Sequence, residues 1–507
     1  MPVPTKRRGC FPVSEQHLRE STDLRAQRHV CAAASRRVVT MIRLLPLLAA
    51  VGVAVFTTSA PAGFGEQAFK LVASDGAAGD GFGRSVDVGG DIIVAGSPND
   101  DDKGSVYLFN AATGTQISKL VADDGRAEDH FGFSVAIAGG IVAVGAPGHE
   151  HGGIDSGAAY LFDASTGAQL AKLTPDDPEE GDEFGNSIAI DNGIVAVGAW
   201  RADEHGDGSG AAYLFDASTG TQLDKLLPDT GNDHQTFGVS IAMDNGIIAI
   251  GARTYFVLGE GYTFAKVYLF DVSTGNQLHR LQADIENYNG DLGGHFGDAV
   301  DIKNGLVAVG TPNRSIFFDF SGAAYVFDAS TGEQLHFIFP ADGHDRDHFG
   351  VSIAIDNGVL AIGANEDDDS AWAAGSAYLF DAISGTQIDK LLASDGAAFD
   401  DFGNSIAIDN DMVVVGAVGD DDNSGSVYVF DEGTAGCPAD LDESGVVDFG
   451  DLLSLLAAWG GIGGDVNGDG TTDFADLLQL LAAWGPCSPA ATRPAPAHQV
   501  VVVRGAR

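Results

Sequence analysis

Cysteine, methionine, tryptophan and basic residues are all scarce in this chain. Its 507 residues include 4 Cys, 4 Met, 4 Trp and 27 Lys or Arg, against 72 Asp or Glu, for a formal net charge of −45. Such a negative chain repels a polyanion, so nucleic acid is excluded as a favourable partner. The hydrophobic content of 44% is nevertheless enough for a large core, which predicts a folded chain with more than one domain.

Long apolar runs are also missing. A membrane-spanning helix needs about 20 apolar residues, and the run from Leu44 to Phe56 is shorter than that. This run follows Arg43 and precedes Ala60-Pro61-Ala62, which is the order of a basic start, an apolar core and a small-residue cleavage site in a secretory signal peptide. Residues 41–62 are therefore predicted to be a signal peptide. We expect an exported protein of bacterial type, secreted or at the cell surface, with no membrane span in the mature chain.

Residues 1–40 precede this signal peptide and are interpreted as a misassigned start upstream of Met41. The alternative is an extended leader that contains Ser35-Arg36-Arg37, which is reminiscent of a twin-arginine signal. Both alternatives lead out of the cytoplasm. Residues 1–62 are therefore assigned to a leader that the mature chain lacks.

Most of the remaining chain repeats one pattern. The dipeptide Phe-Gly recurs at intervals of about 53 residues, a period that is typical of a solenoid or a propeller. It occurs at Phe82, Phe131, Phe184, Phe237, Phe296, Phe349 and Phe402.

Each repeat contains four short runs of β-branched, aromatic and small apolar residues, bounded by turn residues. In the clearest repeat these runs cover residues 187–190, 194–199, 211–215 and 222–226. Asn192-Gly193 suits a type I′ hairpin between the first two runs, because both residues tolerate positive φ. The segment 216–220 (DASTG) predicts a bulged hairpin between the last two. The repeat therefore predicts four strands and no helix.

The ends of the array predict how it closes. Six repeats end in a fourth-strand pattern, but the seventh stops at Asp431. The missing pattern stands at the other end of the array, in Gly65 to Leu71, before the first Phe-Gly. A terminal strand that completes the last blade pairs two open edges and closes a ring. The predicted fold class is therefore mainly β, a seven-bladed β-propeller over residues 63–432.

The pattern F-G-x-S-V-x-I, followed by V-G-A-P and G-A-A-Y-L-F, resembles the FG-GAP repeats of the integrin α-subunit propeller and its bacterial relatives. In that family a calcium loop often lies between the first two strands of a blade. Here Asn192-Gly193 or Gly139-Gly140 occupies that place, and each is too short for an ion that takes about six to eight oxygen ligands. The sequence therefore does not support calcium at the family position.

Two acidic loops near the C-terminus repeat each other. Oxygen-bearing side chains at loop positions 1, 3, 5, 9 and 12, a backbone carbonyl at position 7 and Gly at position 6 meet the EF-hand requirement for calcium. Two calcium ions are predicted, one in each loop. The predicted ligands are Asp440, Asp442, Ser444, Val446, Asp448 and Asp451 in the first loop, and Asp465, Asn467, Asp469, Thr471, Asp473 and Asp476 in the second.

Each loop leads into an apolar segment with helical spacing, Phe449 to Trp459 and Phe474 to Trp484. The two loop-helix units resemble the dockerin module of cellulosome-type assemblies, which implies a small α-helical, dockerin-like domain at residues 437–487. The resemblance also implies a cohesin-like docking partner. Leu452-Leu453 and Leu477-Leu478 stand where characterised dockerins have small hydroxylic residues, so another anchoring surface stays open as the alternative.

Cys437 and Cys487 bracket this module and are the cysteines that remain after the leader. In an oxidising compartment they are predicted to form a disulfide, worth about 2–4 kcal/mol because it restrains the unfolded segment. Two free thiols are the alternative. Residues 488–507 form a tail that begins with a Pro/Ala-rich linker.

Acidic side chains gather on one face of the predicted propeller, the face with the second-to-third-strand loops and the interblade loops. Asn99 to Asp102 (NDDD) is one such run, and Asp pairs recur seven and two residues before Phe-Gly. We interpret these acids as solvated, or as hydrogen-bonded in local turns, in preference to metal sites. Together they would attract cationic ligands.

Blades four and five break the repeat on this face. Their second-to-third loops are rich in aromatic residues, which dominate binding hot spots. The alternative is that these aromatics fold inward and plug the channel mouth. The predicted ligand-binding residues are Tyr255, Phe256, Tyr262, Phe317 and Phe318.

No catalytic residue is predicted, because the acids follow the repeat symmetry and no singular Ser-His-Asp or His-rich constellation stands out. The predicted function is an exported, non-catalytic adhesion or ligand-binding protein. Its propeller would recognise a protein or glycan ligand, and its calcium module would serve as an anchor. The alternative is an enzyme, either a polysaccharide-degrading extracellular component or a quinoprotein-like propeller.

Overall fold

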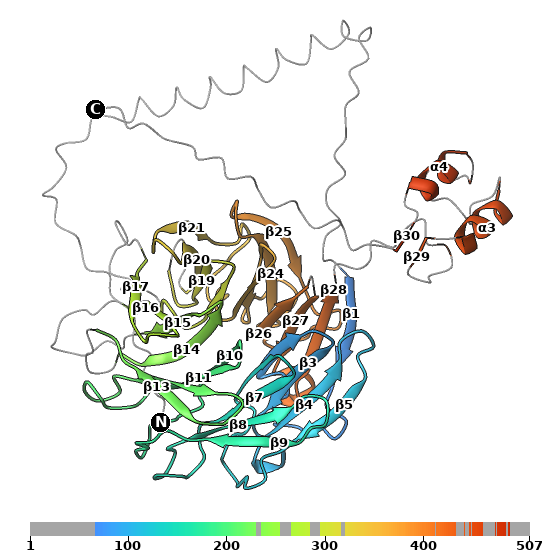
Figure 1. The fold of residues 1–507 in the computed structure, drawn as a ribbon. Coiled ribbons are helices and arrows are strands. Elements are labelled where there is room, and N and C mark those ends of the chain that lie inside the picture. Colours follow the sequence, from blue (N-terminus) through green and yellow to red (C-terminus); the bar gives the residue numbers. More distant parts are fainter. Residues whose placement is uncertain are drawn as a thin grey trace, which may run out of the picture. The chain divides into compact units, whose positions relative to one another are not determined.

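The computed structural model describes the propeller at residues 66–229, 235–253, 265–283, 295–315, 320–410 and 412–431, and a C-terminal part at residues 441, 446–447, 449–459, 472, 474–482 and 485–486. Residues 66–431 form seven four-stranded antiparallel sheets, which are the blades of a seven-bladed β-propeller (Figure 1). Within these ranges no helix is both long enough and apolar enough to cross a membrane. The predicted leader and tail lie outside the described residues.

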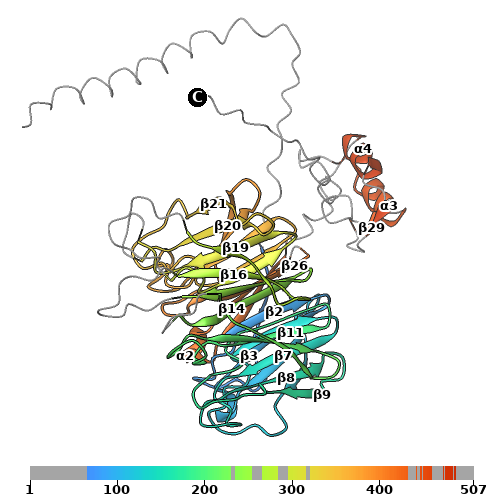
Figure 2. The same ribbon diagram turned by 60° about the vertical axis from the view of Figure 1, so that its left-hand side comes forward.

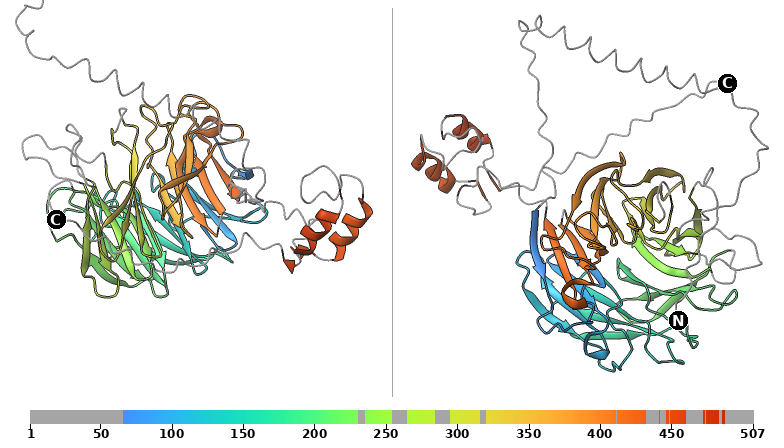
Figure 3. Two further views of the ribbon diagram at one scale, coloured as in Figure 1. Left: turned by 90° about the horizontal axis from the view of Figure 1, so that it is seen from above. Right: turned by 180° about the vertical axis from the view of Figure 1, so that it is seen from behind.

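The blades follow one another along the chain, and Figure 2 and Figure 3 show the ring turned to the side and from behind. Blade 1 is β2 (Ser85–Gly89), β3 (Ile92–Ser97), β4 (Ser105–Asn110) and β5 (Gln116–Leu120); blade 2 is β6 (Ser134–Ala138), β7 (Ile141–Ala146), β8 (Ala158–Asp163) and β9 (Gln169–Leu173); blade 3 is β10 (Ile188–Asp191), β11 (Ile194–Ala199), β12 (Ala211–Asp216) and β13 (Gln222–Leu226). Blade 4 is β14 (Phe237–Asp244), β15 (Ile247–Ala252), β16 (Lys266–Asp271) and β17 (Gln277–Leu281); blade 5 is β18 (Val300–Lys303), β19 (Leu306–Thr311), β20 (Ala323–Asp328) and β21 (Gln334–Ile338). Blade 6 is β22 (Ile353–Asp356), β23 (Val359–Ala364), β24 (Ser376–Asp381) and β25 (Thr386–Leu391); blade 7 is β26 (Phe402–Asp409), β27 (Met412–Ala417), β28 (Ser426–Asp431) and β1 (Glu66–Leu71).

The first strand of the propeller completes its last blade. β1 pairs antiparallel with β28, with Glu66 opposite Asp431 and Leu71 opposite Val427. The two ends of the array are therefore hydrogen-bonded within one sheet, and the predicted closing strand is confirmed. Two short helical turns, η1 (Asp100–Asp102) and α2 (Asp420–Asn423), lie in second-to-third loops, where no helix was predicted.

The turns within a blade have the predicted geometry. In blade 3, Asn192 and Gly193 adopt φ values of 46° and 78°, as a type I′ hairpin requires. The carboxylate of Asp216 accepts hydrogen bonds from two backbone N–H groups of the following turn, each at 2.9 Å. The strand pairing there shifts register between Leu214 and Phe215. This shift is the predicted β-bulge.

Each Phe-Gly dipeptide joins its blade to the preceding one. In blade 3, the ring of Phe184 packs edge-on against Tyr213 and Phe215, with centroids 5.5 and 5.8 Å apart. The backbone of Phe184 pairs with Gly157 of blade 2 in an isolated bridge. A Cβ on Gly157 would lie 2.0 Å from the carbonyl oxygen of Phe184, so only glycine permits this approach.

Serine hydroxyl groups add a second link between neighbouring blades. Ser134 Oγ of blade 2 donates to the carbonyl oxygen of Gly185 at 2.8 Å, and Ser405 Oγ of blade 7 donates to that of Gly83 at 2.7 Å across the closed seam. Blade 5 has Ala299 at this position. The same bond joins Ser85 to Gly132, Ser187 to Gly238, Ser240 to Gly297 and Ser352 to Gly403.

The hydrophobic core is continuous across the blade interfaces. The cluster around Phe184 combines the buried side chains of Leu161 and Leu173 from blade 2 with those of Val195 and Val197 from blade 3. Because every blade shares its core with the next, disruption of the packing in one blade also disturbs the packing of its neighbours.

The C-terminal part contains α3 (Phe449–Ala457), α4 (Phe474–Ala482) and a short ladder between β29 (Val446–Val447) and β30 (Gly485–Pro486). Two helices that start at the expected phenylalanines are therefore present. Leu455 and Leu480 are fully buried in a small core, against which the partly buried Leu441, Leu452 and Leu477 pack.

We expect Gly145→Ala to destabilise the propeller by about 3 kcal/mol or more, because backbone atoms cannot move aside as a side chain can. Its Cβ would lie 2.0 Å from the carbonyl oxygen of Gly185 in the next blade. Denaturant unfolding of the mature chain measures the change. Gly76→Ala is the matched control, since its Cβ would meet Ala73 at an ordinary 3.4 Å. Equal stability of the two variants would contradict the tight joint.

Candidate binding sites of the propeller

Five blades hold a lysine ammonium group among acidic side chains on the loop face, the end of the propeller that carries the second-to-third and interblade loops. In blade 1, Lys119 Nζ lies 2.6 Å from Asp100 Oδ2 and 2.8 Å from Asp75 Oδ2. The hydroxyl oxygen of Tyr107 lies 2.9 Å from both carboxylates. We call such a group of Lys, Tyr and acids an ammonium cluster. The clusters centre on Lys119, Lys172, Lys225, Lys390 and Lys70.

The ammonium clusters use the Asp that precedes Phe-Gly by seven residues. These carboxylates, on Asp75, Asp124, Asp177, Asp342 and Asp395, each bond the lysine of their cluster. They were expected to be solvated or bonded in local turns, which is wrong for this set, because packing of the outer strand brings the lysine to them. The lysine ammonium of each cluster is thus bound to the acid that precedes Phe-Gly by seven residues.

The Asp that precedes Phe-Gly by two residues behaves as expected. In blade 1, Asp80 Oδ2 accepts a hydrogen bond from the backbone N–H of Ala77 at 2.6 Å, which closes a local turn. The same bond is made by Asp129, Asp182, Asp347 and Asp400. This second set of acids is therefore structural.

The charges of an ammonium cluster stabilise one another. Burial disfavours the charge on Lys119, but its hydrogen bonds to Asp100 and Asp75 outweigh burial and raise its pKa. The hydrogen bond from Lys119 in turn lowers the pKa of Asp75. Burial raises the pKa of Tyr107, so this hydroxyl stays neutral. The cluster of blade 1 is thus an internal salt at neutral pH.

Blade 2 contains a histidine in its ammonium cluster. The side chain of His149 is 2% exposed, with Nδ1 at 2.8 Å from Asp129 Oδ2 and Nε2 at 2.6 Å from Lys172 Nζ. Lysine can only donate, so Nε2 accepts and the proton sits on Nδ1. The histidine replaces the loop carboxylate that Asp100 supplies in blade 1.

Blades 4 and 5 depart from the pattern. In blade 4, Gln235 Nε2 donates to the hydroxyl of Tyr268 at 2.8 Å. In blade 5, the guanidinium group of the loop residue Arg314 lies 5.8 Å from the ring centroid of Tyr325 and 5.7 Å from that of Phe337. Phe337 occupies the position of the outer strand that holds the lysine in the ammonium clusters. Among their described residues, the two blades whose loops carry the predicted ligand-binding residues thus show no regular ammonium cluster.

One described sector of the loop face joins blades 3, 4 and 5. Two guanidinium groups lie close to the indole ring of Trp200, with the ring centroid 4.7 Å from that of Arg201 and 5.4 Å from that of Arg253. Trp200 Nε1 donates to Glu183 at 2.7 Å, and Arg201 forms an ion pair with the same carboxylate at 2.8 Å. Arg253 reaches Asp298 of blade 5 at 3.4 Å. We call these five residues the rim sector.

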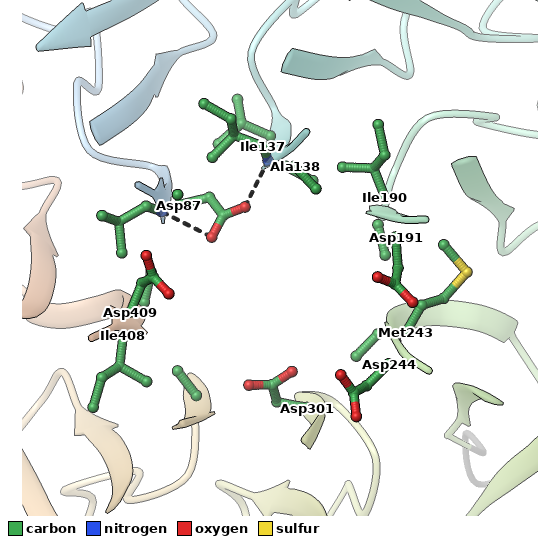
Figure 4. Close-up of a pocket in the computed structure, with 18 of the residues that line it drawn as sticks. Asp87, Ile137, Ala138, Ile190, Asp191, Met243, Asp244, Asp301, Ile408 and Asp409 are labelled. Atoms are coloured by element: carbon green, nitrogen blue, oxygen red, sulfur yellow. Dashed lines mark hydrogen bonds between the residues drawn. The ribbon is translucent and has the colours of Figure 1, made fainter. Parts of the chain in front are cut away.

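The central channel contains an acidic cavity of about 670 Å³ at the end opposite the loop face. Figure 4 shows the carboxylates of Asp87, Asp191, Asp244, Asp301 and Asp409 around its open space. Asp244 accepts a hydrogen bond from the backbone of Asn304 in the next blade at 2.8 Å, and Asp409 accepts one from Gly90 at 3.0 Å. These acids therefore link neighbouring blades through hydrogen bonds. Their negative charge also gives the cavity an affinity for cations.

Two of the channel acids differ from the rest. Asp87 and Asp301 stand where the other five blades have alanine. Each accepts hydrogen bonds from its own strand and from the next blade, as in the 2.7 Å bond from the backbone of Ile137 to Asp87. Burial raises the pKa of both carboxyl groups to about 7. The sequence analysis missed this site, although the two Ala-to-Asp exchanges in the repeat were visible.

A possible metal-ligand group occurs in blade 6 among the described residues. His344, Asp368 and Asp369 place ligand atoms within 4.8 Å of one another, and all three are exposed. Asp369 is bound to the ammonium of Lys390 at 2.6 Å, which opposes a second cation there. This group belongs to the edge of an ammonium cluster.

The predicted site residues lie mostly outside the described residues. Tyr255, Phe256, Tyr262, Phe317 and Phe318 all do, as do Cys437 and Cys487. Of the twelve predicted calcium ligands, Val446 lies in β29, Asp451 in α3 with a fully buried side chain, and Asp476 in α4. The other nine lie outside the described residues.

A family model described as the FG-GAP repeat matches residues 65–109, 115–162, 168–215, 333–380 and 386–430. The propeller is built from FG-GAP repeats. The stretch between the third and fourth matches holds blade 4 and most of blade 5, the blades whose described residues form no ammonium cluster. A search of curated proteins found no match to the chain. The FG-GAP assignment therefore rests on five repeats and on the blade geometry that all seven share.

We expect Lys119→Met to lower the free energy of unfolding by about 2–4 kcal/mol, because it leaves the buried Asp100 beside Asp75 without a cation. Denaturant unfolding measures the loss. Asp101→Asn is the control, since Asp101 lies 3.6 Å from the same ammonium with an 83% exposed side chain. It should change stability by less than about 0.5 kcal/mol. Similar effects of the two substitutions on the free energy of unfolding would argue against a stabilising role of the Lys119 ammonium group.

We expect the pair Asp87→Ala and Asp301→Ala, made together, to change how stability depends on pH. A carboxyl group whose folded pKa is about 7 binds more protons in the folded state between pH values of about 4 and 7, so its contribution to stability falls as pH rises through that window. The wild type should thus lose stability relative to the double variant between pH 4.5 and pH 8, by roughly 1.4 kcal/mol per unit of pKa difference at most.

Denaturant unfolding at both pH values measures this difference. Asp91→Ala is the control, because its exposed side chain lines the same cavity. A stability difference between wild type and double variant that does not change with pH would refute the assigned burial of the two acids.

Proposed function

We propose that the chain is an exported, non-catalytic adhesion or ligand-binding protein, whose FG-GAP propeller recognises a protein or glycan ligand and whose C-terminal module is a calcium-dependent anchor. The observation that supports recognition most directly is the rim sector. The ring of Trp200 contacts the guanidinium groups of Arg201 and Arg253, and its hydrogen bond to Glu183 fixes the ring. A rigid aromatic platform loses little entropy when it binds.

The rim sector also lies close in sequence to the predicted ligand-binding residues. Arg253 directly follows β15 and stands two residues before Tyr255. Asp298 belongs to blade 5, whose second-to-third loop carries Phe317 and Phe318. Two members of the rim sector, Arg253 and Asp298, thus belong to the two blades whose loops carry the predicted ligand-binding residues, which supports recognition by this part of the face.

The C-terminal helices support an anchoring role. Each helix exposes the same three apolar side chains at matching positions, which is unusual for a surface without a partner. The exposed pairs are Phe449 and Phe474 at 63% and 62%, Leu453 and Leu478 at 53% and 54%, and Leu456 and Leu481, each at 48%. This symmetry fits a dockerin-like module that docks on a cohesin-like or another anchoring surface.

The residues present also fit calcium in this module. Asp451 holds position 12 of the first predicted loop, and its carboxylate is fully buried at the start of α3. Carboxylate oxygens are ligands that calcium prefers, and position 12 of such a loop is a ligand position. Asp451 would thus hold calcium together with the other acids of its loop.

Pull-downs with the mature chain test the proposal. A protein or glycan should be recovered through the propeller with calcium and with chelator, and an anchoring partner only with calcium. Recovery of no partner under either condition would count against recognition. Release of sugars from a polysaccharide by the purified chain would identify an enzyme instead.

Alanine substitutions at Tyr255, Phe256, Tyr262, Phe317 and Phe318 should weaken the recovered ligand by about 2 kcal/mol or more at the strongest positions, as binding hot spots do. The melting temperature of the propeller should stay unchanged. Ile154→Ala is the control, because Ile154 is 58% exposed on blade 2, outside the rim sector. A lowered melting temperature with unchanged binding would show that these aromatics plug the channel mouth.

Chelation should unfold the module at residues 437–487 and leave the propeller folded, because calcium that binds only the folded loops stabilises them by mass action. Helical circular dichroism during a calcium titration measures the first effect, and near-ultraviolet signals of the propeller the second. An unchanged helical signal, or a propeller that melts first on chelation, would contradict the calcium loops.

A further inference from the structure

The channel holds a second cavity, of about 230 Å³, on the loop-face side of the acidic one. Arg84 of blade 1 lines it, together with serine, asparagine and apolar residues from the other blades. The equivalent positions in blades 3 and 7 carry Asn186 and Asn404, and those in blades 4 and 6 carry Val239 and Val351. Arg84 therefore brings a charge that the repeat does not require.

The guanidinium of Arg84 has no carboxylate partner among the described residues. It donates to Asn404 Oδ1 at 3.3 Å and stacks on the ring of Phe133, with 4.9 Å between the guanidinium carbon and the ring centroid. Neither contact carries negative charge. Burial lowers the pKa of Arg84, because protein atoms surround the group even though it faces the channel space.

The acids of the channel do not reach Arg84. Seven β-branched side chains, one from each blade, line both cavities and so form an apolar layer between them. These residues are Val86, Val135, Ile188, Ile241, Val300, Ile353 and Ile406. Asp298 is the acid at the position of Arg84 in blade 5, and its carboxylate is bound to Arg253 at 3.4 Å and to His295 at 3.1 Å.

Apart from Arg84 and Asn404, the polar side chains around this cavity already form hydrogen bonds with the backbone of neighbouring blades. The serine hydroxyls donate to glycine carbonyls of the next blade, and Asn186 Nδ2 donates to the backbone of Val239 at 3.1 Å. A cation left without a counter-ion in a confined space is costly, and an anion from solution that sits against it removes most of that cost. The site therefore favours an anion that enters from the loop face.

We propose that the Arg84 cavity binds a small carboxylate. The planar guanidinium can donate two parallel hydrogen bonds to a carboxylate, which neither a halide nor a neutral ligand can match. The amide of Asn404, fixed beside Arg84 by its Oδ1, provides further polar contact. This site is separate from the rim sector and does not depend on the function proposed for it.

Acetate is the probe for this site. Calorimetric titration of the mature chain with sodium acetate, at constant ionic strength, should show one saturable site. Arg84→Val and Arg84→Asn introduce the residues that other blades carry at this position. Both should weaken acetate binding about 10- to 100-fold, because each removes charge-assisted hydrogen bonds.

Asn186→Val is the matched control, since it changes polarity at the equivalent position of blade 3 and leaves the guanidinium in place. It should keep acetate binding within about twofold, as expected for a substitution that removes no charged contact. Without acetate, Arg84→Val should raise the melting temperature, because it removes an unpaired charge; a purely structural arginine would lower it.

Three results would overturn the proposal. They are no acetate binding by the wild type, equal acetate binding by wild type and both Arg84 variants, and chloride binding as tight as acetate binding at the same site.

Discussion

The close approach of two backbones at every Phe-Gly dipeptide is the constraint on which the propeller depends. At each joint a glycine faces a carbonyl oxygen of the next blade at a distance that no Cβ could tolerate, as Gly145 does against Gly185. This approach lets serine hydroxyls such as that of Ser134 reach across the interface and lets neighbouring blades share one core. The ring is thus held by repeated backbone contacts, and the side chains on its two ends are left to vary.

The same geometry organises the charge of a strongly acidic chain. Because the blades are regular, the outer-strand lysine meets the acids of the loop face at the same place in five blades, and these acids form internal ion pairs. A second group of acids lines the channel at the end opposite the loops, and Lys303 lines the same cavity. The acids thus include a set that pairs with lysines on the loop face and a set that joins neighbouring blades around the channel.

The features that could be predicted from the sequence are local or repeated. Positive φ at Asn192, the bulge after Leu214 and the strand pattern missing after Asp431 each depend on a few neighbouring residues, or on comparison between repeats, and the structure confirms all three. The helical pattern after Phe449 and Phe474 is of the same kind.

The sites could not be predicted in the same way, because they combine residues that only packing brings together. Lys119 comes from an outer strand and Asp75 from the segment before the blade, so no spacing rule links them. The acids around the channel come from different blades, and Asp87 stood out in the sequence only as an exchange for alanine. The structure adds what a one-dimensional pattern lacks, which is the identity of the neighbours in the next blade.

The pairing of β1 with β28 has a consequence for how the chain folds. β1 is synthesised first but pairs with β28, which is synthesised last in the array, so the ring cannot close until the whole array has been made. Contacts between such distant segments form slowly, because the chain must lose loop-closure entropy before the new contacts contribute favourable free energy. Until β28 has been synthesised, β1 is without its partner strand in the ring. The first strand of the ring to be made is thus the last to be paired.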